Sequence, residues 1–432
     1  MTSPRSATHP FSRILTVLTG GFALLFLTGC SPVEFMRQVF SMSGPQSTMM
    51  TAGPVAQRQW DLFMITVWVC LFIFIVVGAV LAYTQIKYRA RSEADEHAEP
   101  PAEAGHGNPL VEIGLIAGSV ILLVIIAIPT VRDIWYTHDV PEEDRKSAID
   151  ITATGYQWWF KFEYPSELVK SATGENPLTT GNELVVPAGT PIRVHLRTVD
   201  VIHSFWIPKL AGKVDMMPNR ANFLWFKADK PGYYYGQCAE YCGESHAIMK
   251  FRVIALSPAE YIKWLDNQKA AARTVTAQSL AAEAQVPHVK FAAFQATPGN
   301  TFGGSPAFDA DPFAYWNTKQ KPDAGENAQL IAAGRKLFQD KTCITCHTVR
   351  GHEGIGITGP ELTHVGARSS IAAGVLENTP ERLHEWIKRP DYFKPGNKMY
   401  HGGYIDVSNG QPKFTLTDPE IDALVAYLHS LK

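Results

Sequence analysis

Two short cysteine-containing segments hold the residues best able to do chemistry. In the first, Cys238 and Cys242 are separated by three residues and are followed by His246 and Met249, while His203 lies 35 residues upstream of Cys238. Two thiolates, imidazoles and a thioether form a soft ligand set, and soft sets favour copper. A mononuclear copper site would use one cysteine, so the second cysteine predicts two coppers that share two bridging thiolates.

Two alternatives exist for this cysteine pair. A tetrahedral zinc site with two cysteines and two histidines is one, but zinc does not explain a methionine at this spacing. A disulfide between Cys238 and Cys242 would be an inactive, metal-free form in an oxidising compartment.

Other residues could compete as ligands within the same region. Met216 and Met217 offer thioethers, but the spacing from His246 favours Met249. His195 alternates with apolar neighbours in a strand-like pattern, so we expect a structural role for it.

The second segment is Cys343-Ile-Thr-Cys346-His347, the signature of covalent c-type haem attachment. Both thiols would form thioethers, and His347 would be the proximal iron ligand. A thioredoxin-like CxxC would not explain the downstream Gly359–Leu362 and Lys394–Met399 segments.

Met399 is the only methionine after Met249, which makes it the candidate sixth haem ligand. Methionine ligation opposite histidine raises the reduction potential of a haem. His352 and His364 are the competing candidates.

The first element expected from the sequence is an N-terminal signal peptide. Arg5 and Arg13 precede an apolar stretch that ends in Leu-Thr-Gly-Cys30, the layout of a lipoprotein signal peptide with Cys30 as the lipidated residue. An ordinary signal anchor with an accidental cysteine is the alternative.

Two later apolar runs, 62–83 and 110–131, are each long enough to cross a membrane as helices. Lys87, Arg89 and Arg91 lie between them, and basic residues beside a membrane stay on the cytoplasmic side, so the rest of the chain should face outward. Glu112 opens the second run, where a carboxylate marks either a proton route or an interfacial contact.

The remaining chain divides by composition. Short strand-like segments from 149 to 255, separated by Pro and Gly, predict an antiparallel sandwich or barrel. Residues 266–325 are rich in Ala, Gly, Pro, Gln and Thr and predict a linker, which if flexible would span roughly 45 Å. The expected parts are a signal peptide (1–29), an N-terminal segment (30–59), a transmembrane hairpin (60–131), a copper domain (148–265), the linker and a haem domain (326–432).

Charge excludes one class of partner. The chain has 39 Lys and Arg against 41 Asp and Glu, which leaves no basic excess for binding nucleic acid.

The first motif, with the hairpin and the Gly155–Trp159 segment before it, resembles subunit II of haem-copper cytochrome c oxidases over residues 45–265. The C-terminal pattern resembles a class I cytochrome c. This resemblance implies three parts: a two-helix transmembrane hairpin, an all-β cupredoxin-like Greek-key domain and an all-α cytochrome c domain. It also implies that Gly334 and Phe338 pack against Tyr427.

The resemblance assigns roles to single residues. Cys238 and Cys242 would bridge the binuclear copper centre, CuA. His203 and Met249 would complete one copper, and His246 and the Glu240 carbonyl the other. The Glu240 side chain would bind a magnesium at the subunit I interface. Electrons would enter at Trp158, and Glu112 would lie at the mouth of the K proton pathway.

The implied function is the electron-transfer subunit of a haem-copper terminal oxidase in a bacterial inner membrane, with copper and haem on the periplasmic side. Its partners would be subunit I, subunit III and cytochrome c or another periplasmic donor. We expect no catalytic residue on this chain, because oxygen is reduced in subunit I. The alternatives are the CuA subunit of a nitric oxide reductase and a copper-handling assembly protein; a quinol oxidase subunit is disfavoured because that branch lacks the copper ligands.

Overall fold

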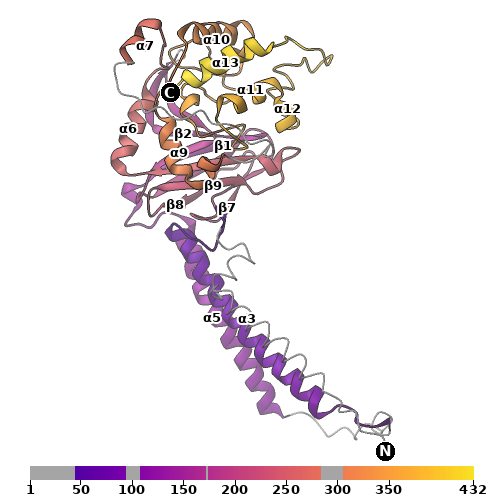
Figure 1. Cartoon of the computed structure of the whole chain (residues 1–432). Helices are drawn as coiled ribbons and strands as arrows, with labels where there is room; N and C mark the ends of the chain where they lie inside the picture. Colours follow the sequence, from indigo (N-terminus) through magenta and orange to yellow (C-terminus); the bar gives the residue numbers. More distant parts are fainter. Residues whose placement is uncertain (1–43, 94–107, 172–173, 284–304) are drawn as a thin grey trace, which may run out of the picture.

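The computed structural model describes residues 44–93, 108–171, 174–283 and 305–432 (Figure 1). It shows a rod of two helices, a β-sandwich at the end of the rod, and a helical domain on the side of the sandwich away from the rod. The signal peptide and Cys30 lie outside the described residues.

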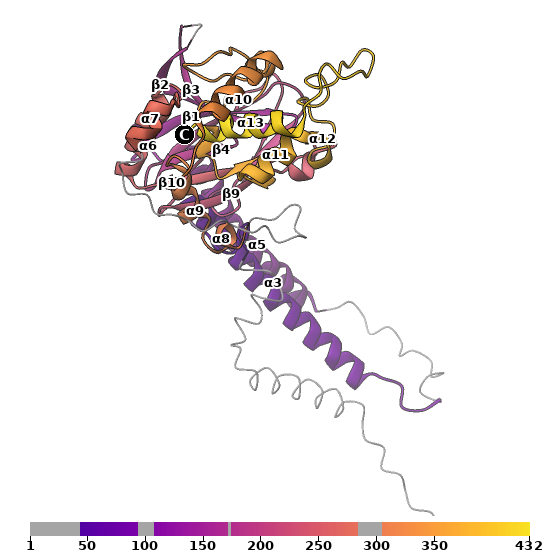
Figure 2. The same ribbon diagram turned by 45° about the horizontal axis from the view of Figure 1, so that its top comes forward.

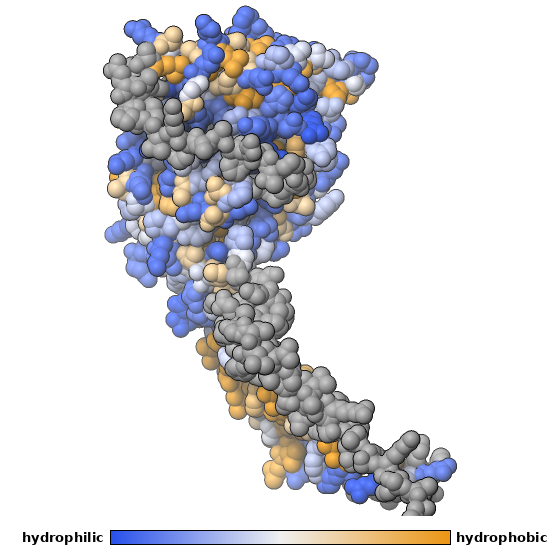
Figure 3. Space-filling model, viewed as in Figure 1, coloured by the Kyte–Doolittle hydropathy of each residue, from blue (hydrophilic) through white to orange (hydrophobic). Residues whose placement is uncertain are grey.

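The rod consists of α3 (Pro54–Lys87) and α5 (Pro109–His138), both long and apolar enough to cross a membrane. Their apolar side chains are exposed along the rod (Figure 3), as expected for helices that face lipid. At about 1.5 Å per residue both helices exceed a hydrocarbon core of about 30 Å, so their ends reach the sandwich.

The junction between the rod and the sandwich is built from α5 and the start of α3. Arg58 lies 3.6 Å from Asp133 and stacks over the ring of Tyr136. The indole N–H of Trp225 donates to the Tyr136 carbonyl at 3.1 Å. These contacts hold the two helices to each other and to the β-domain.

The sandwich consists of two five-stranded sheets, in the orders β3-β2-β1-β5-β8 and β4-β10-β9-β6-β7. Its strands are β1 (Ile149–Tyr156), β2 (Trp159–Ser171), β3 (Gly174–Gly181), β4 (Glu183–Pro187), β5 (Ile192–Thr198), β6 (His203–Trp206), β7 (Lys213–Met216), β8 (Asn222–Phe226), β9 (Gly232–Cys238) and β10 (Lys250–Leu256).

The sheets are not purely antiparallel, which corrects the sequence expectation. β1 pairs with β5 and β4 pairs with β10 in parallel. Each parallel pair joins strands that are not consecutive, so the chain crosses to the other sheet before it returns. The alternation of apolar residues shows which face of a strand is buried, but it does not show whether neighbouring strands run parallel or antiparallel. Phe160, Phe162, Phe205 and Phe251 meet in the core between the sheets.

The haem domain is built on α10 (Ala328–Asp340), α11 (Pro380–Lys388), α12 (Pro390–Phe393) and α13 (Asp418–Ser430). A side chain at Gly334 would lie 1.9 Å from the Ala423 carbonyl oxygen, so glycine allows α10 and α13 to cross closely. The Phe338 and Tyr427 rings lie 5.6 Å apart. The expected packing of Gly334 and Phe338 against Tyr427 is confirmed.

The described parts of the expected linker are not a free tether. They contain α6 (Pro258–Lys269, which starts within the copper domain), α7 (Ala277–Glu283), α8 (Pro306–Ala310) and α9 (Pro312–Lys319). Ala272 and Val275 are buried in the haem-domain core, and Trp316 is buried against the sandwich. Composition suggested flexibility, but a few apolar side chains suffice to dock these short segments.

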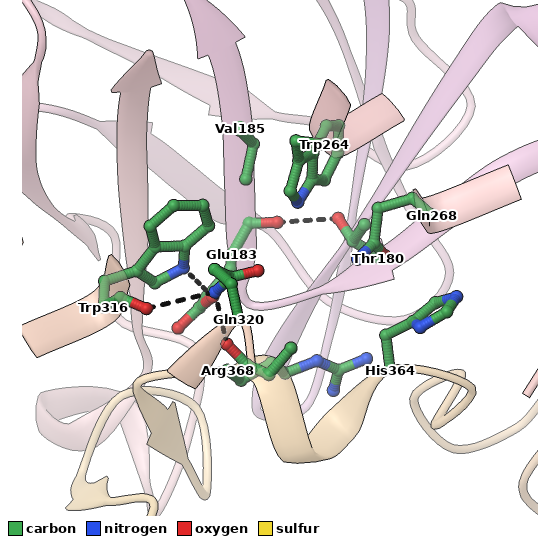
Figure 4. Close-up of a pocket in the computed structure, with 10 residues that line it drawn as sticks. Thr180, Glu183, Val185, Trp264, Gln268, Trp316, Gln320, His364 and Arg368 are labelled. Carbon is green, nitrogen blue, oxygen red and sulfur yellow. Dashed lines mark hydrogen bonds between the residues drawn. The ribbon is translucent and has the colours of Figure 1, made fainter. Parts of the chain in front are cut away.

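The haem domain lies against the sandwich (Figure 2). Buried polar contacts join the two domains. Glu183 of β4 accepts hydrogen bonds from the Ser369 N–H at 2.8 Å, the Ser369 hydroxyl at 2.6 Å and the Trp316 indole N–H at 3.1 Å. Glu183 and Trp316 border a cavity of about 20 Å³ between the domains (Figure 4). Burial raises the pKa of Glu183, and the donors oppose that rise.

Candidate metal and haem centres

The residues of the first motif converge at one end of the second sheet. Cys238 is the last residue of β9 and His203 the first of β6, and these strands pair with Phe205 opposite Cys238. The chain then turns through Cys242 into a short 3₁₀ helix, His246–Ile248, and Met249 follows it. Strand pairing therefore brings His203 to a cluster that is otherwise local in sequence.

The donor atoms are in contact. The Cys238 and Cys242 sulfurs lie 3.7 Å apart, and both cysteines are free. Three more contacts complete the cluster: Cys238 Sγ to His203 Nδ1 at 3.9 Å, Cys242 Sγ to His246 Nδ1 at 3.5 Å and Cys242 Sγ to Met249 Sδ at 3.8 Å. The Glu240 carbonyl oxygen lies 3.2 Å from Cys238 Sγ.

This donor set fits copper. Each sulfur faces one imidazole Nδ1, and the methionine sulfur and a main-chain carbonyl lie on opposite thiols, the two-fold arrangement that a thiolate-bridged metal pair requires. Hydrogen bonds from Cys242 and His203 outweigh burial and lower the pKa of Cys238, while the contact with Cys238 raises the pKa of Cys242. The thiolate is the form of cysteine that binds metal.

Asp200 orients one imidazole and was missed in the sequence. Its carboxylate lies 2.9 Å from His203 Nε2, so His203 presents Nδ1 to the sulfurs. Burial would raise the pKa of Asp200, but hydrogen bonds from His203 and from the main-chain N–H groups of Gln157 and Val201 lower it to about 2. An acidic residue three positions before a ligand histidine was the available signal.

The competing residues have other partners. The His195 imidazole bonds to Asp150 at 2.8 Å, in keeping with a structural role. Met216 is buried on β7 opposite His203 in the strand register.

The haem motif is shaped around His347. Its Nδ1 lies 2.7 Å from the Pro360 carbonyl oxygen, which leaves Nε2 free to bind iron. A side chain at Gly359 would lie 2.5 Å from the imidazole, so the ring packs directly on the main chain. Burial lowers the pKa of His347 and favours the neutral, metal-binding form. Cys343 and Cys346 lie on the adjoining turn as free thiols, so the residues present fit a covalently attached haem.

The two histidines that competed for the sixth position are engaged elsewhere. His352 uses Nδ1 for the Tyr427 hydroxyl at 2.9 Å and Nε2 for Thr274 at 3.2 Å. His364 faces the main-chain carbonyls of Lys432 and Ala270 with its two ring nitrogens. This leaves Met399 as the remaining candidate from the sequence.

Comparisons with known proteins identify both domains that carry these residues. Residues 149–256 match the family described as cytochrome C oxidase subunit II, periplasmic domain, and residues 331–432 match the cytochrome c family. Cytochrome c oxidase subunit 2 of Alkalihalophilus pseudofirmus is 32% identical over 413 residues, which cover 95% of each chain. The chain belongs to the cytochrome c oxidase subunit 2 family.

Two other similar proteins match only part of this chain. Quinol oxidase subunit 2 of Bacillus cereus is 32% identical but matches 59% of this chain and 79% of its own length. The solved periplasmic domain of cytochrome oxidase subunit II from Bradyrhizobium japonicum is 35% identical, covers 28% of this chain and 93% of its own, and has a TM-score of 0.24.

As a member of the cytochrome c oxidase subunit 2 family, the chain is a membrane-anchored electron-transfer subunit of an oxidase, with domains for CuA copper and haem c. The antiparallel-sandwich detail aside, the expected three-part fold is confirmed.

Trp158 lies between the Cys242 turn and the Gly396 segment of the C-terminal domain. Its indole N–H donates to the Cys242 carbonyl at 3.0 Å, and its side chain is 8% exposed. A side chain at Gly396 would lie 3.0 Å from the Trp158 ring, so the Met399 segment of the haem domain covers this tryptophan. The position of this contact was not foreseen from the sequence.

Glu112 and Glu240 are the two remaining candidates from the sequence. Glu112 lies in the exposed first turn of α5. The half-buried Glu240 lies between the two cysteines.

Proposed function

We propose that this chain receives electrons at a c-type haem, passes them to a binuclear CuA centre, and delivers them to a haem-copper subunit I that reduces oxygen to water. The observation that carries the proposal is Trp158, which contacts the Met399 segment on one side and the Cys242 carbonyl on the other. This contact links the two candidate centres within one chain.

The proposed copper ligands are the groups that the sulfur cluster brings together, divided between the two metals as the family resemblance implies. Cys238 and Cys242 would hold both metals, His203 and Met249 would complete one copper, and His246 and the Glu240 carbonyl would complete the other. Bound there, the centre supplies reversible one-electron transfer. The protein holds the ligands in a preformed arrangement, with His203, Cys238, Cys242 and Met249 buried, which limits the structural change that each electron transfer would require.

The proposed haem ligands are His347 and Met399, with thioether bonds to Cys343 and Cys346. A haem and a copper pair held by these residues would supply balanced one-electron transfer from the first to the second. The role of this chain's residues is to exclude water between the centres and to hold the haem domain against Trp158.

The proposed setting is a bacterial inner membrane that the hairpin crosses twice, with both metal domains on the periplasmic side and Cys30 lipidated. Lys87, Arg89 and Arg91 at the end of α3 support this orientation. The same proposal places Glu112 at the mouth of a proton pathway and the Glu240 side chain on a magnesium at the subunit I interface. Subunit III and a periplasmic cytochrome c complete the partners.

The first test is metal content and spectroscopy of the purified full chain. We expect two coppers and one haem per chain and an EPR signal from an unpaired electron shared by two coppers. Cys238→Ser should abolish this signal, whereas Met249→Leu should shift the copper potential with little loss of copper, because the thioether is a weak ligand. Met217→Leu, which changes a neighbouring thioether outside the cluster, is the matched control.

One copper or one zinc per chain would contradict the proposed centre. Turnover of membranes with oxygen and with nitric oxide then identifies the reaction of the partner subunit. Nitric oxide turnover without oxygen consumption would exclude the oxidase assignment of subunit I.

A further inference from the structure

Lys394 of the haem domain reaches across the domain interface to the turn that carries two of the proposed copper ligands. It follows α12 and is 4% exposed. Its ammonium group donates to the Ile248 carbonyl at 3.0 Å and lies 3.4 Å from the Ala372 carbonyl. Ile248 ends the 3₁₀ turn that begins at His246 and directly precedes Met249.

A second bond crosses the interface at the other end of the same turn. The Ser245 hydroxyl donates to the Pro395 carbonyl at 2.7 Å. Two adjacent residues of the haem domain, Lys394 and Pro395, therefore hold the residues on either side of the His246–Ala247 segment. These two hydrogen bonds constrain the main chain between His246 and Met249.

Burying the Lys394 amine costs free energy, because the charged group loses its hydration. Removing an ammonium group from water disfavours its charged form, and here burial lowers the pKa of Lys394 to about 7 while the nearby Cys242 opposes the shift. Both acceptors of the Lys394 amine are main-chain carbonyls, and neither is a carboxylate that would offset its charge. A methionine or leucine would fill the same space without this cost, so simple packing does not account for the amine.

We propose that Lys394 is a positioning residue for the copper centre, which fixes the His246–Met249 turn from the haem domain and raises the reduction potential of the copper that this domain reduces. The inference rests on the proposed copper centre. Hydrogen bonds and positive charge just outside a metal's ligands favour its reduced form. The docked haem domain is then part of what sets the potential of its own electron acceptor.

The test compares three variants of the full chain. Lys394→Met removes the amine and keeps the side-chain length, while Lys394→Gln keeps an N–H donor without the charge. Ser369→Ala is the matched control, because it removes interface hydrogen bonds to Glu183 and Tyr233 at a distance from the copper ligands. Each protein is measured by copper content, EPR and spectroelectrochemical titration of both centres.

We expect Lys394→Met to retain two coppers, lower the copper potential and alter the copper EPR hyperfine pattern, with the haem potential unchanged. Lys394→Gln should give a smaller shift, and Ser369→Ala none. If Lys394→Met fails to load copper, Lys394→Gln must still lower the potential.

Two results would overturn the inference. One is an unchanged copper potential in the lysine variants; the other is an equal shift in Ser369→Ala, which would show that Lys394 acts only by holding the domains together. Failure of the proposed function is distinguishable, since the wild-type chain would then lack the binuclear copper signal altogether.

Discussion

The indole N–H of Trp158 donates to the carbonyl oxygen of Cys242, with 3.0 Å between the nitrogen and the oxygen. The opposite edge of the same ring lies against Gly396, three residues before Met399. One side chain thus touches both the segment that holds the proposed copper ligands and the segment that holds the proposed haem ligand. It is also covered, so a soluble donor has little access to it while the haem domain stays docked.

Trp158→Phe should slow electron transfer from haem to copper, because it removes the hydrogen bond to Cys242 and part of the ring that contacts the haem domain. Copper and haem content should not change. The rate is measured by flash reduction of the haem followed by the near-infrared absorbance of copper. Trp159→Phe is the matched control, since Trp159 stacks on Tyr156 instead. Equal rates in the two variants would exclude a route through Trp158.

Gly396→Ala should weaken docking of the haem domain. Gly396 has φ of +73°, and an added Cβ would lie 2.6 Å from Glu244 and 3.0 Å from Trp158. The backbone strain alone costs about 1–2 kcal/mol for a residue other than glycine. Gly410→Ala is the control: it has φ of +70° but open space around the new Cβ.

Transfer from haem to copper should therefore slow in Gly396→Ala and stay at the wild-type rate in Gly410→Ala. A wild-type rate in both would mean that the Gly396 contact does not hold the domains in their transfer geometry.

Met399→Leu should remove the weak sulfur-to-iron absorption band and lower the haem potential, because leucine offers no lone pair to iron. Visible spectra and a redox titration measure both effects. His352→Asn should keep the band, since His352 is bonded to Tyr427 and Thr274. If the wild-type haem lacked this band and Met399→Leu left its spectrum unchanged, the sixth ligand would be a histidine.

Asp323 should make the haem domain sensitive to acid. Burial would raise the pKa of this carboxyl, but a hydrogen bond from His429 and the charge of Lys432 lower it to about 2 from the usual 3.8. A carboxyl with a lowered folded-state pKa stabilises the fold above its unfolded pKa, and this stabilisation is lost as the pH falls from about 4 to about 2.

Asp323→Asn should reduce stability at neutral pH by about 1 kcal/mol, a value discounted because the Asp323 side chain is 45% exposed. The variant should also unfold with a smaller pH dependence in that interval. Thermal unfolding of the detergent-solubilised chain, followed through haem absorbance, measures both. An unaltered pH dependence would show that these contacts contribute no stability.

The linker shows where sequence reasoning failed and why. Its composition is typical of flexible chain, yet the indole of Trp316 donates to Glu183. Ala272 and Val275 join the core of the haem domain. These contacts join residues far apart in the chain, and composition averaged over sixty residues does not reveal a few side chains that dock.

The sequence by itself indicated the donor sets of the two candidate centres and the pair of apolar helices. Cys238, Cys242, His246 and Met249 lie within one turn-rich segment, as do Cys343, Cys346 and His347, so their spacing alone brings the donors together. Continuous apolar runs determine the hairpin for a similar reason, because burial in lipid depends on composition over a local stretch.

Only the tertiary structure decided what lies between the centres. The pairing of β6 with β9 brings His203 to Cys238, and the docked haem domain places Gly396 on Trp158 and Lys394 on Ile248. Such contacts depend on the shapes and desolvation of two surfaces that form only after each domain folds. The spacing of residues in the sequence does not indicate these contacts. The sequence therefore identified two candidate electron-transfer centres but did not show how the domains that carry them meet.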